Sequence, residues 1–357
     1  MNSIFSTKSP ICDISAVIDK DENAYYLYLI GHPDTEPMVL RTLWICNRKP
    51  APKELDIAGM EEGKAPMLPA GNVSADHPAD GMELDVEKLG AVWYESGDSI
   101  TIFYDEEVIC SVPPYAGFHD FPGFSRYAKG QHRYAWSMPD AMDNFLRRID
   151  RSIDFWSYVN GDLWAKAQDE HIGVLDKFFG SKHDKFFGID GKKFPPRALA
   201  QGHRDGVVYG ISLGISLFPM PKSEIVFDAD YHKYSHIELG FAAEEQFSPM
   251  MTTMYSLIGR TADVPWQTLN VLWHGHNFTF NGIDGFGGIV LINPIAVEGL
   301  EKPEYRNFLG DDINLLWLVP VTKEELDFLN KEGMEAFMGR CKNPERLHIF
   351  DNKPKFS

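Results

Sequence analysis

Two histidines separated by one glycine, His274 and His276 in the segment VLWHGHNFTF, have the side-chain type and spacing that could bind a metal ion. On a strand, side chains two positions apart lie on one face, so both imidazoles would point toward the same cation. A third ligand is needed, and His232 or His236 could supply it from a neighbouring strand. The same spacing fits two half-buried histidines that hydrogen-bond to the backbone at a sheet end. Nothing in the sequence separates these two interpretations.

A glycine-rich run, GIDGFGG at residues 282–288, has the composition of a phosphate-binding loop. Such a loop must lead into a helix whose N-terminal amides face the phosphate. Here the chain continues as the strand-like IVLINP, and no GK[ST] triplet follows. We therefore expect a flexible hairpin loop.

Pairs of acidic residues could in principle serve as an acid and a base in hydrolysis. The pairs Asp311–Asp312, Glu244–Glu245 and Glu324–Glu325 are adjacent in sequence, so their side chains diverge in extended segments. The surroundings of Cys46 and Cys110 also match no nucleophile signature. The sequence predicts no catalytic residue, no metal and no cofactor. A metal-dependent enzyme built around His274 and His276 is the alternative.

The charge balance favours one class of partner. The chain has 357 residues, with 52 acidic against 34 basic ones and a formal net charge of −18. Nucleic acids and anionic membranes attract cationic surfaces, so neither is an expected partner. A basic protein would be attracted. The sequence does not indicate the oligomeric state.

Cysteine usage and hydropathy predict a cytoplasmic location. Cys12, Cys46, Cys110 and Cys341 are scattered without a C-x-x-C pair, which is typical of reduced, buried thiols. The N-terminus MNSIFSTKSP has no apolar core of the kind found in secretory signals. No apolar run approaches the ~18 residues that span a bilayer.

The first 135 residues read as a β-rich domain. Apolar runs separated by turn residues predict strands at residues 14–18, 25–30, 39–46, 91–94, 100–104 and 108–112. Residues 48–79 are rich in proline, glycine and charge, and predict a long surface excursion.

Helices are expected to join this domain to the second half. Phe145, Ile149, Ile153 and Trp156 recur at helical spacing, and a second helix is expected over 162–179. Residues 183–198 read as a turn-rich passage. Strands are then expected at 207–218, 234–241, 269–280 and 288–292.

These elements mix without a regular β–α alternation, which indicates an α+β fold with mixed, largely antiparallel sheets flanked by helices, in two domains. We predict a β-rich accessory domain (1–135), a helical connector (136–185), an α+β domain (186–345) and a C-terminal tail (346–357).

The segment 311–340 makes the clearest structural prediction. Its apolar run at 313–321 fits a strand buried on both faces. Thr322 is then an N-cap, and Glu325 three residues later completes a capping box. An apolar stripe continues through the following helix. This segment positions other residues and carries no chemistry of its own.

Four blocks in the second half together resemble the suppressor of fused family. They are GISLGISLFP (210–219), HIELGF (236–241), VLWHGHNFTF (271–280) and DINLLWLVPVTKEELDFL (312–329), in the order that the family shows. The resemblance covers about residues 199–340. The first half is similar to longer bacterial members, through GKAPMLPAG (63–71), AVWYESGDSITIF (91–103), VPPYAGFHDFPGFSRYA (112–128) and FFGIDGKKFPPRAL (186–199).

The resemblance implies a protein-binding protein without enzymatic activity. Animal members hold a short extended peptide of a transcription factor, and bacterial relatives are regarded as immunity proteins that neutralise toxins. The family's peptide-contacting aromatic position falls on His236, and its acidic residues after that strand fall on Glu244 and Glu245. The expected contact residues are His236, Glu238, Glu244, Glu245, His274 and His276. The expected partner is a protein, namely a basic toxin domain.

Overall fold

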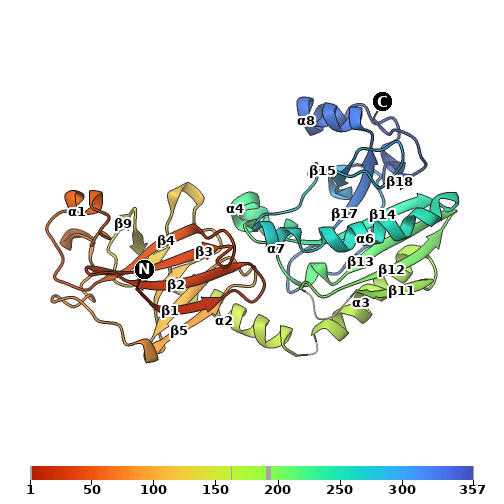
Figure 1. The fold of residues 1–357 in the computed structure, drawn as a ribbon. Coiled ribbons are helices and arrows are strands. Elements are labelled where there is room, and N and C mark those ends of the chain that lie inside the picture. The colour runs from red at the N-terminus through yellow and green to blue at the C-terminus, as the bar shows by residue number, and fades with distance from the viewer. Residues whose placement is uncertain (1, 162, 190–193, 357) are drawn as a thin grey trace. The chain divides into compact units, whose positions relative to one another are not determined.

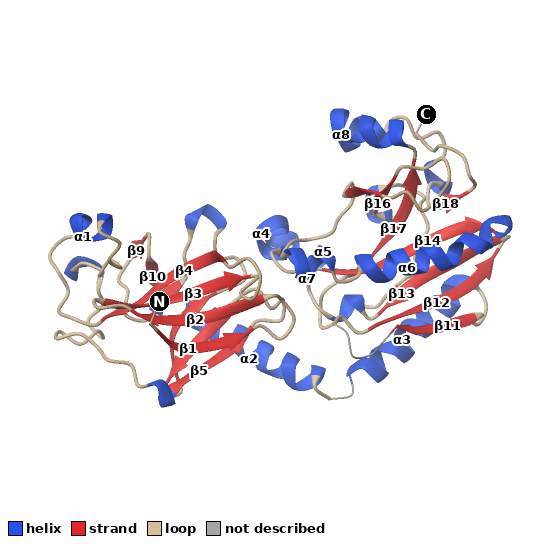
Figure 2. Ribbon diagram, viewed as in Figure 1, coloured by secondary structure: helices blue, strands red, loops and turns tan. Residues whose placement is uncertain are grey.

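The computed structural model describes residues 2–161, 163–189 and 194–356, and the chain divides into two compact units. Unit 1 consists of residues 1–161 and 224–228, and unit 2 of residues 162–223 and 229–357 (Figure 1). Helices and largely antiparallel sheets make up the fold (Figure 2), so the predicted α+β class is confirmed. The domain boundaries expected from the sequence stay a prediction.

Unit 1 contains two sheets. The first is an antiparallel meander of β1 (Ser3–Lys8), β2 (Ile14–Lys20), β3 (Ala24–Gly31) and β4 (Met38–Asn47). The second has the order β5-β6-β7-β8-β10-β9, formed by β5 (Leu89–Trp93), β6 (Ile100–Tyr104), β7 (Glu107–Val112), β8 (Phe124–Ser125), β9 (Gln131–His132) and β10 (Ala135–Ser137). All six strands predicted for this half are present, whereas β1, β8, β9 and β10 were not expected.

The two sheets of unit 1 pack through β4, which contacts β7, β8 and β10. The Ser125 hydroxyl donates to the backbone oxygen of Ile45 over 2.7 Å and so links the sheets. The excursion after β4 includes the short helix α1 (Ile57–Glu61). Helix α2 (Met142–Val159) lies against β5, where the Trp156 indole donates to the backbone oxygen of Trp93 over 2.7 Å. Phe145 and Ile149 are buried as their spacing predicts, but Ile153 is 47% exposed.

Unit 2 is built on one mixed sheet with the order β11-β12-β13-β14-β17-β16-β15. Its strands are β11 (Lys185–Ile189), β12 (Arg197–Arg204), β13 (Val207–Leu213), β14 (His236–Glu244), β15 (Asn277–Thr279), β16 (Gly288–Ile292), β17 (Ile313–Val321) and β18 (Ile349–Phe350). Strand β14 pairs in parallel with β17 and, further along, with β18, while the other pairs are antiparallel. Strand β14 is therefore held on both edges.

Strand β17 occupies the predicted residues 313–321 and is buried from its second residue onward. Pro320 lacks a backbone N–H, yet the strand tolerates it because pairing with β14 ends at Trp317. Thr322 caps helix α8 (Lys323–Met338) and forms the predicted capping box with Glu325.

Helices cover both faces of this sheet. Helix α3 (Leu163–Phe179) packs on β12 and β13, and its Leu175 and Phe179 join a core with Tyr209 and Trp317. Helix α6 (Met251–Thr261) lies over β13 and β14 on the other face. A Cβ added at Gly210 would lie 2.1 Å from the Tyr255 ring, so glycine is what lets α6 approach. The remaining helices are α4 (Ser223–Phe227), α5 (Tyr231–Tyr234) and α7 (Val264–Thr268).

Three sequence-based expectations for unit 2 are wrong. The passage 183–198 contains β11 and the start of β12 rather than turns alone. The strand expected over 207–218 ends at Leu213, because Gly214 adopts φ 105° and turns the chain into a 3-10 helix. Of residues 269–280, the structure places 277–279 in a strand.

Candidate functional site

Glu238 lies at the centre of a buried polar cluster in unit 2. Its side chain is fully buried, and one carboxylate oxygen accepts hydrogen bonds from the Gly214 amide (2.8 Å), the Ser216 amide (3.1 Å) and the Ser216 hydroxyl (2.6 Å). The other oxygen accepts from the Ser212 hydroxyl over 2.6 Å. An ionised carboxylate has only acceptor atoms, so it suits a position that four hydrogen-bond donors surround.

The local backbone explains why a carboxylate is needed there. Pairing between β13 and β14 stops at Ile211 and Gly240, so the strands separate beyond that point. The Ser212 hydroxyl accepts from the Leu239 amide over 2.8 Å and takes the place of a backbone partner. Glu238 fills the gap and satisfies the amides that the turn at Gly214 leaves unpaired, since buried amides without partners are costly.

His236 extends this cluster toward the start of β17. It is 2% exposed, and its Nδ1 lies 2.7 Å from the backbone oxygen of Ser216. Its Nε2 lies 3.4 Å from the Asp311 carboxylate, which also pairs with His232 Nδ1. Because His236 and Glu238 both bind Ser216, the two residues belong to one structural unit. In this conformation neither can touch a partner, and their contribution is to hold β14 in place.

The opposite end of β14 carries exposed acidic residues. We define the acidic end of the sheet as Asp184, Asp205, Glu244 and Glu245. Glu244 pairs with Val207 at the end of the β13–β14 ladder, and the Glu245 amide donates to the backbone oxygen of Gly206 over 3.0 Å. The Glu245 side chain is 59% exposed and that of Asp205 93%. These carboxylates therefore face solvent from a rigid strand end.

A histidine joins two members of the acidic end. His203 Nε2 lies 3.2 Å from Glu245, and its Nδ1 pairs with Asp184 beside β11. The adjacent β12–β13 turn is Asp205-Gly206, with φ 53° and 76°. Both values are positive, as a type I′ hairpin turn requires, and Asp-Gly is a favoured sequence for it. The turn fixes the position of Asp205 at the acidic end of the sheet.

His274 and His276 do not share a strand face; both hydrogen-bond to the backbone, which is the second of the two interpretations that the sequence left open. They flank Gly275, which has φ 87°, in a turn before β15. The Nδ1 of His274 accepts from the Asn293 amide over 3.2 Å. The Nδ1 of His276 accepts from the Trp273 amide over 3.2 Å. Partial burial lowers the pKa of both imidazoles.

These hydrogen bonds oppose metal binding by the pair. A neutral imidazole that accepts at Nδ1 carries its proton on Nε2, so neither nitrogen has a free lone pair for a cation. His232 and His236, the proposed third ligands, bind Asp311 instead. Within the described ranges, no group of three or more His, Cys, Asp and Glu residues is arranged to hold a metal ion.

The six contact residues expected from the sequence thus fall into three places. His236 and Glu238 lie together in the buried cluster, and Glu244 and Glu245 lie at the other end of the same strand. The strand has nine residues, so its ends are roughly 26 Å apart at a rise of about 3.3 Å per residue. His274 and His276 are in the turn before β15. His276 is exposed and stays a predicted contact residue.

Sequence reasoning missed Asp184, Asp205 and His203. The Asp-Gly pair at 205–206, between two runs of strand-forming residues, was a usable hairpin signal. The pairing of His203 with Asp184 and Glu245 depends on three strands and had no sequence signal.

Two further findings concern the cysteines and the helices. All four cysteines are free, and Cys12, Cys46 and Cys110 are buried. In the part of the chain that the structure describes, no helix combines the length and the apolar character needed to cross a membrane.

Comparison with known proteins gives a family match in the second half of the chain. Residues 189–353 match the family model described as suppressor of fused protein (SUFU), a longer stretch than the four sequence blocks delimit. No curated protein sequence matches the chain significantly.

Proposed function

Because residues 189–353 belong to the suppressor of fused family, a family of non-enzymatic regulatory and protein-binding domains, we propose that this chain binds and neutralises a basic toxin domain. In this proposal it is an immunity protein that acts in the cytoplasm. The acidic end of the sheet is the contact surface, and the buried cluster around Glu238 positions it.

The observation that carries the proposal is the exposure of four carboxylates at one fixed end of β14. Asp184 precedes β11, Asp205 lies in the β12–β13 turn, Glu244 ends β14 and Glu245 follows it. Backbone pairing holds these strands together. Opposite charge across an interface accelerates association and sets orientation. The overall charge of −18 extends this attraction beyond the contact itself.

A coupled pair of experiments tests the proposal. Tagged protein is used to capture the products of neighbouring genes, and the host is tested for sensitivity to the recovered partner after deletion of this gene. The proposal requires a basic partner that inhibits growth of the deletion strain. Recovery of no neighbouring product, together with unchanged growth of the deletion strain, would contradict it.

The metal-dependent enzyme considered from the sequence has no structural observation in its favour. Metal analysis of protein purified without an affinity tag, followed by a chelator melt of the wild type and of His276→Ala, tests it directly. Bound metal that His276→Ala releases would revive this alternative.

A further inference from the structure

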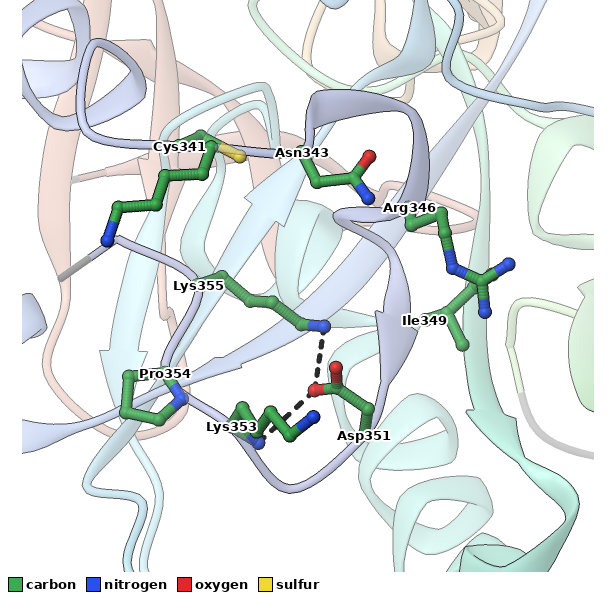
Figure 3. Close-up of a pocket in the computed structure, with 9 residues that line it drawn as sticks. Cys341, Asn343, Arg346, Ile349, Asp351, Lys353, Pro354 and Lys355 are labelled. Atoms are coloured by element: carbon green, nitrogen blue, oxygen red, sulfur yellow. Dashed lines mark hydrogen bonds and ion pairs between the residues drawn. The ribbon is translucent and has the colours of Figure 1, made fainter.

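A pocket formed by the C-terminal segment stands out by its charge. It has a volume of about 200 Å³, and its walls include Lys342, Arg346, Lys353 and Lys355 (Figure 3). One carboxylate, that of Asp351, also lines it. Four cations around one carboxylate contrast with a chain in which acidic residues outnumber basic ones by 52 to 34.

We propose that this pocket binds a phosphate group. A compact dianion matches the excess of positive charge, and arginine and lysine are the side chains that bind phosphate in proteins. The proposal does not depend on the function proposed above. Arg346 lies 3.9 Å from Glu244 at the acidic end of the sheet, but a phosphate ligand and a basic partner would be held by groups of opposite charge.

The backbone that carries these side chains is anchored on both sides of the pocket. On one side, Ile349 and Phe350 pair with β14. On the other side, the buried Phe356 ring stacks on the Phe337 ring with 3.7 Å between the ring centroids. The backbone amide of Phe356 donates to the Glu325 carboxylate over 2.7 Å. Residues 346–357, which the sequence suggested as a tail, contribute these anchors.

The single carboxylate in the pocket is already neutralised. The Lys355 ammonium lies 2.7 Å from Asp351, and the Lys353 amide donates to the same carboxylate oxygen over 3.2 Å. Figure 3 shows the Lys355 ammonium and the Asp351 carboxylate facing each other in the middle of the pocket. The Lys355 side chain is largely buried, with 16% of its surface exposed. Asp351 thus orients Lys355 and leaves the other cations for a ligand.

The remaining cations are available. Arg346 pairs loosely with Glu244 at 3.9 Å, and its side chain is 55% exposed. Among the described residues, no carboxylate lies within ion-pair distance of the ammonium of Lys342 or Lys353. The Arg346 guanidinium offers a planar fork for two phosphate oxygens, and the lysines add point charges.

A buried neighbour is consistent with positive potential in this region. His348 is 1% exposed, and neither of its ring nitrogens has a hydrogen-bond partner within the described part of the chain. Burial lowers the pKa of His348 to about 3, and the nearby cations Arg204, Arg346 and Lys355 add to this shift.

The test is calorimetric titration of the full chain with inorganic phosphate at constant ionic strength. The variants are Arg346→Gln alone and combined with Lys353→Gln, and Lys302→Gln is the matched control because it removes an exposed charge outside the pocket. We expect saturable binding that weakens at least tenfold in the double variant and is unchanged in the control. Absent binding to the wild type, or equal binding to the double variant, would overturn the proposal.

A second set of titrations identifies the kind of molecule that carries the phosphate. Phosphoserine within a short peptide is compared with the unphosphorylated peptide and with inorganic phosphate. Tighter binding of the phosphopeptide indicates a modified protein ligand, and equal affinity for free phosphate indicates a small molecule. Equal affinity for both peptides, with no response to inorganic phosphate, counts against a phosphate site. Because both variants change exposed side chains, a melting curve suffices to show that they fold.

Discussion

Replacement of Glu238 separates a positional role from a contact role for this residue. In Glu238→Ala, the amides of Gly214 and Ser216 lose their acceptor, as do two serine hydroxyls. The hydroxyls can rotate toward other acceptors, but the two amides are fixed by the turn. An unsatisfied buried donor costs about 1–3 kcal/mol, and a lost hydrogen bond to a charged group about 1.5–3 kcal/mol. We expect a loss of about 4–6 kcal/mol in the free energy of unfolding.

Glu238→Gln is the milder change and keeps the test measurable if the alanine variant fails to fold. The side-chain amide oxygen of the glutamine can still accept hydrogen bonds from the three donors that bind Oε1 in the wild type. Its amide nitrogen can donate to the Ser212 hydroxyl oxygen. The loss is then the charge assistance, about 1–3 kcal/mol. Glu245→Gln serves as the matched control, because its side chain is 59% exposed and surface changes fall within about 0.5 kcal/mol.

Urea unfolding followed by circular dichroism measures all three variants. The expected order of destabilisation is Glu238→Ala, then Glu238→Gln, then Glu245→Gln close to the wild type. If Glu238→Ala lowered the free energy of unfolding by less than about 1 kcal/mol, the four hydrogen bonds would not be stabilising and the positional role would be refuted.

Three further predictions concern the stability of unit 2. His348 has a pKa of about 3 in the folded state against about 6.5 when unfolded, so below pH 6.5 the unfolded chain binds the proton first. The free energy of unfolding falls by about 1.4 kcal/mol per pH unit as the pH drops from 6.5 toward 3. In urea titrations, the wild type should lose roughly 2 kcal/mol of this free energy between pH 7 and pH 5 that His348→Leu does not lose. Thr322→Ala should cost about 1 kcal/mol through loss of the cap on α8, with the exposed helical Thr253→Ala as control in the same assay. Gly210→Ala should cost about 1–3 kcal/mol and lower the melting temperature, because its Cβ would lie 2.1 Å from the Tyr255 ring.

Each of these predictions has an outcome that contradicts it. An unchanged pH slope in His348→Leu would mean that other groups cause the acid sensitivity. Equal stabilities for Thr322→Ala and Thr253→Ala would show that the capping box is not stabilising. A Gly210→Ala variant as stable as the wild type would show that α6 can shift away from β13 at no cost.

The parts of the fold that depend on neighbouring residues were predictable from the sequence. Strand β17 and the capping box of Thr322 and Glu325 follow from an apolar run and a spacing of three residues. The meander of β5, β6 and β7 follows from short apolar runs separated by turn residues. In each case the interactions that fix the element lie close together in the chain.

Features that depend on distant contacts were not predictable. Glu238 reads as one more acidic residue in HIELGF, and its burial follows from the separation of β13 and β14 beyond Ile211. Strand β18 has two residues, which form a strand because β14 offers them a partner. His274 and His276 have strand-like spacing, but the φ of 87° at Gly275 turns the chain there.

The rate at which the captured partner associates with charge-reversed protein tests the central claim most directly. The variant Glu244→Lys with Glu245→Lys changes the acidic end of the sheet, and Glu61→Lys with Glu62→Lys makes the same change in charge at an exposed pair in unit 1. We predict that the first variant slows association roughly tenfold or more at low salt and reduces its salt dependence, whereas the second binds nearly as the wild type does. Equal association rates for the two variants would contradict the proposal that the acidic end binds the partner.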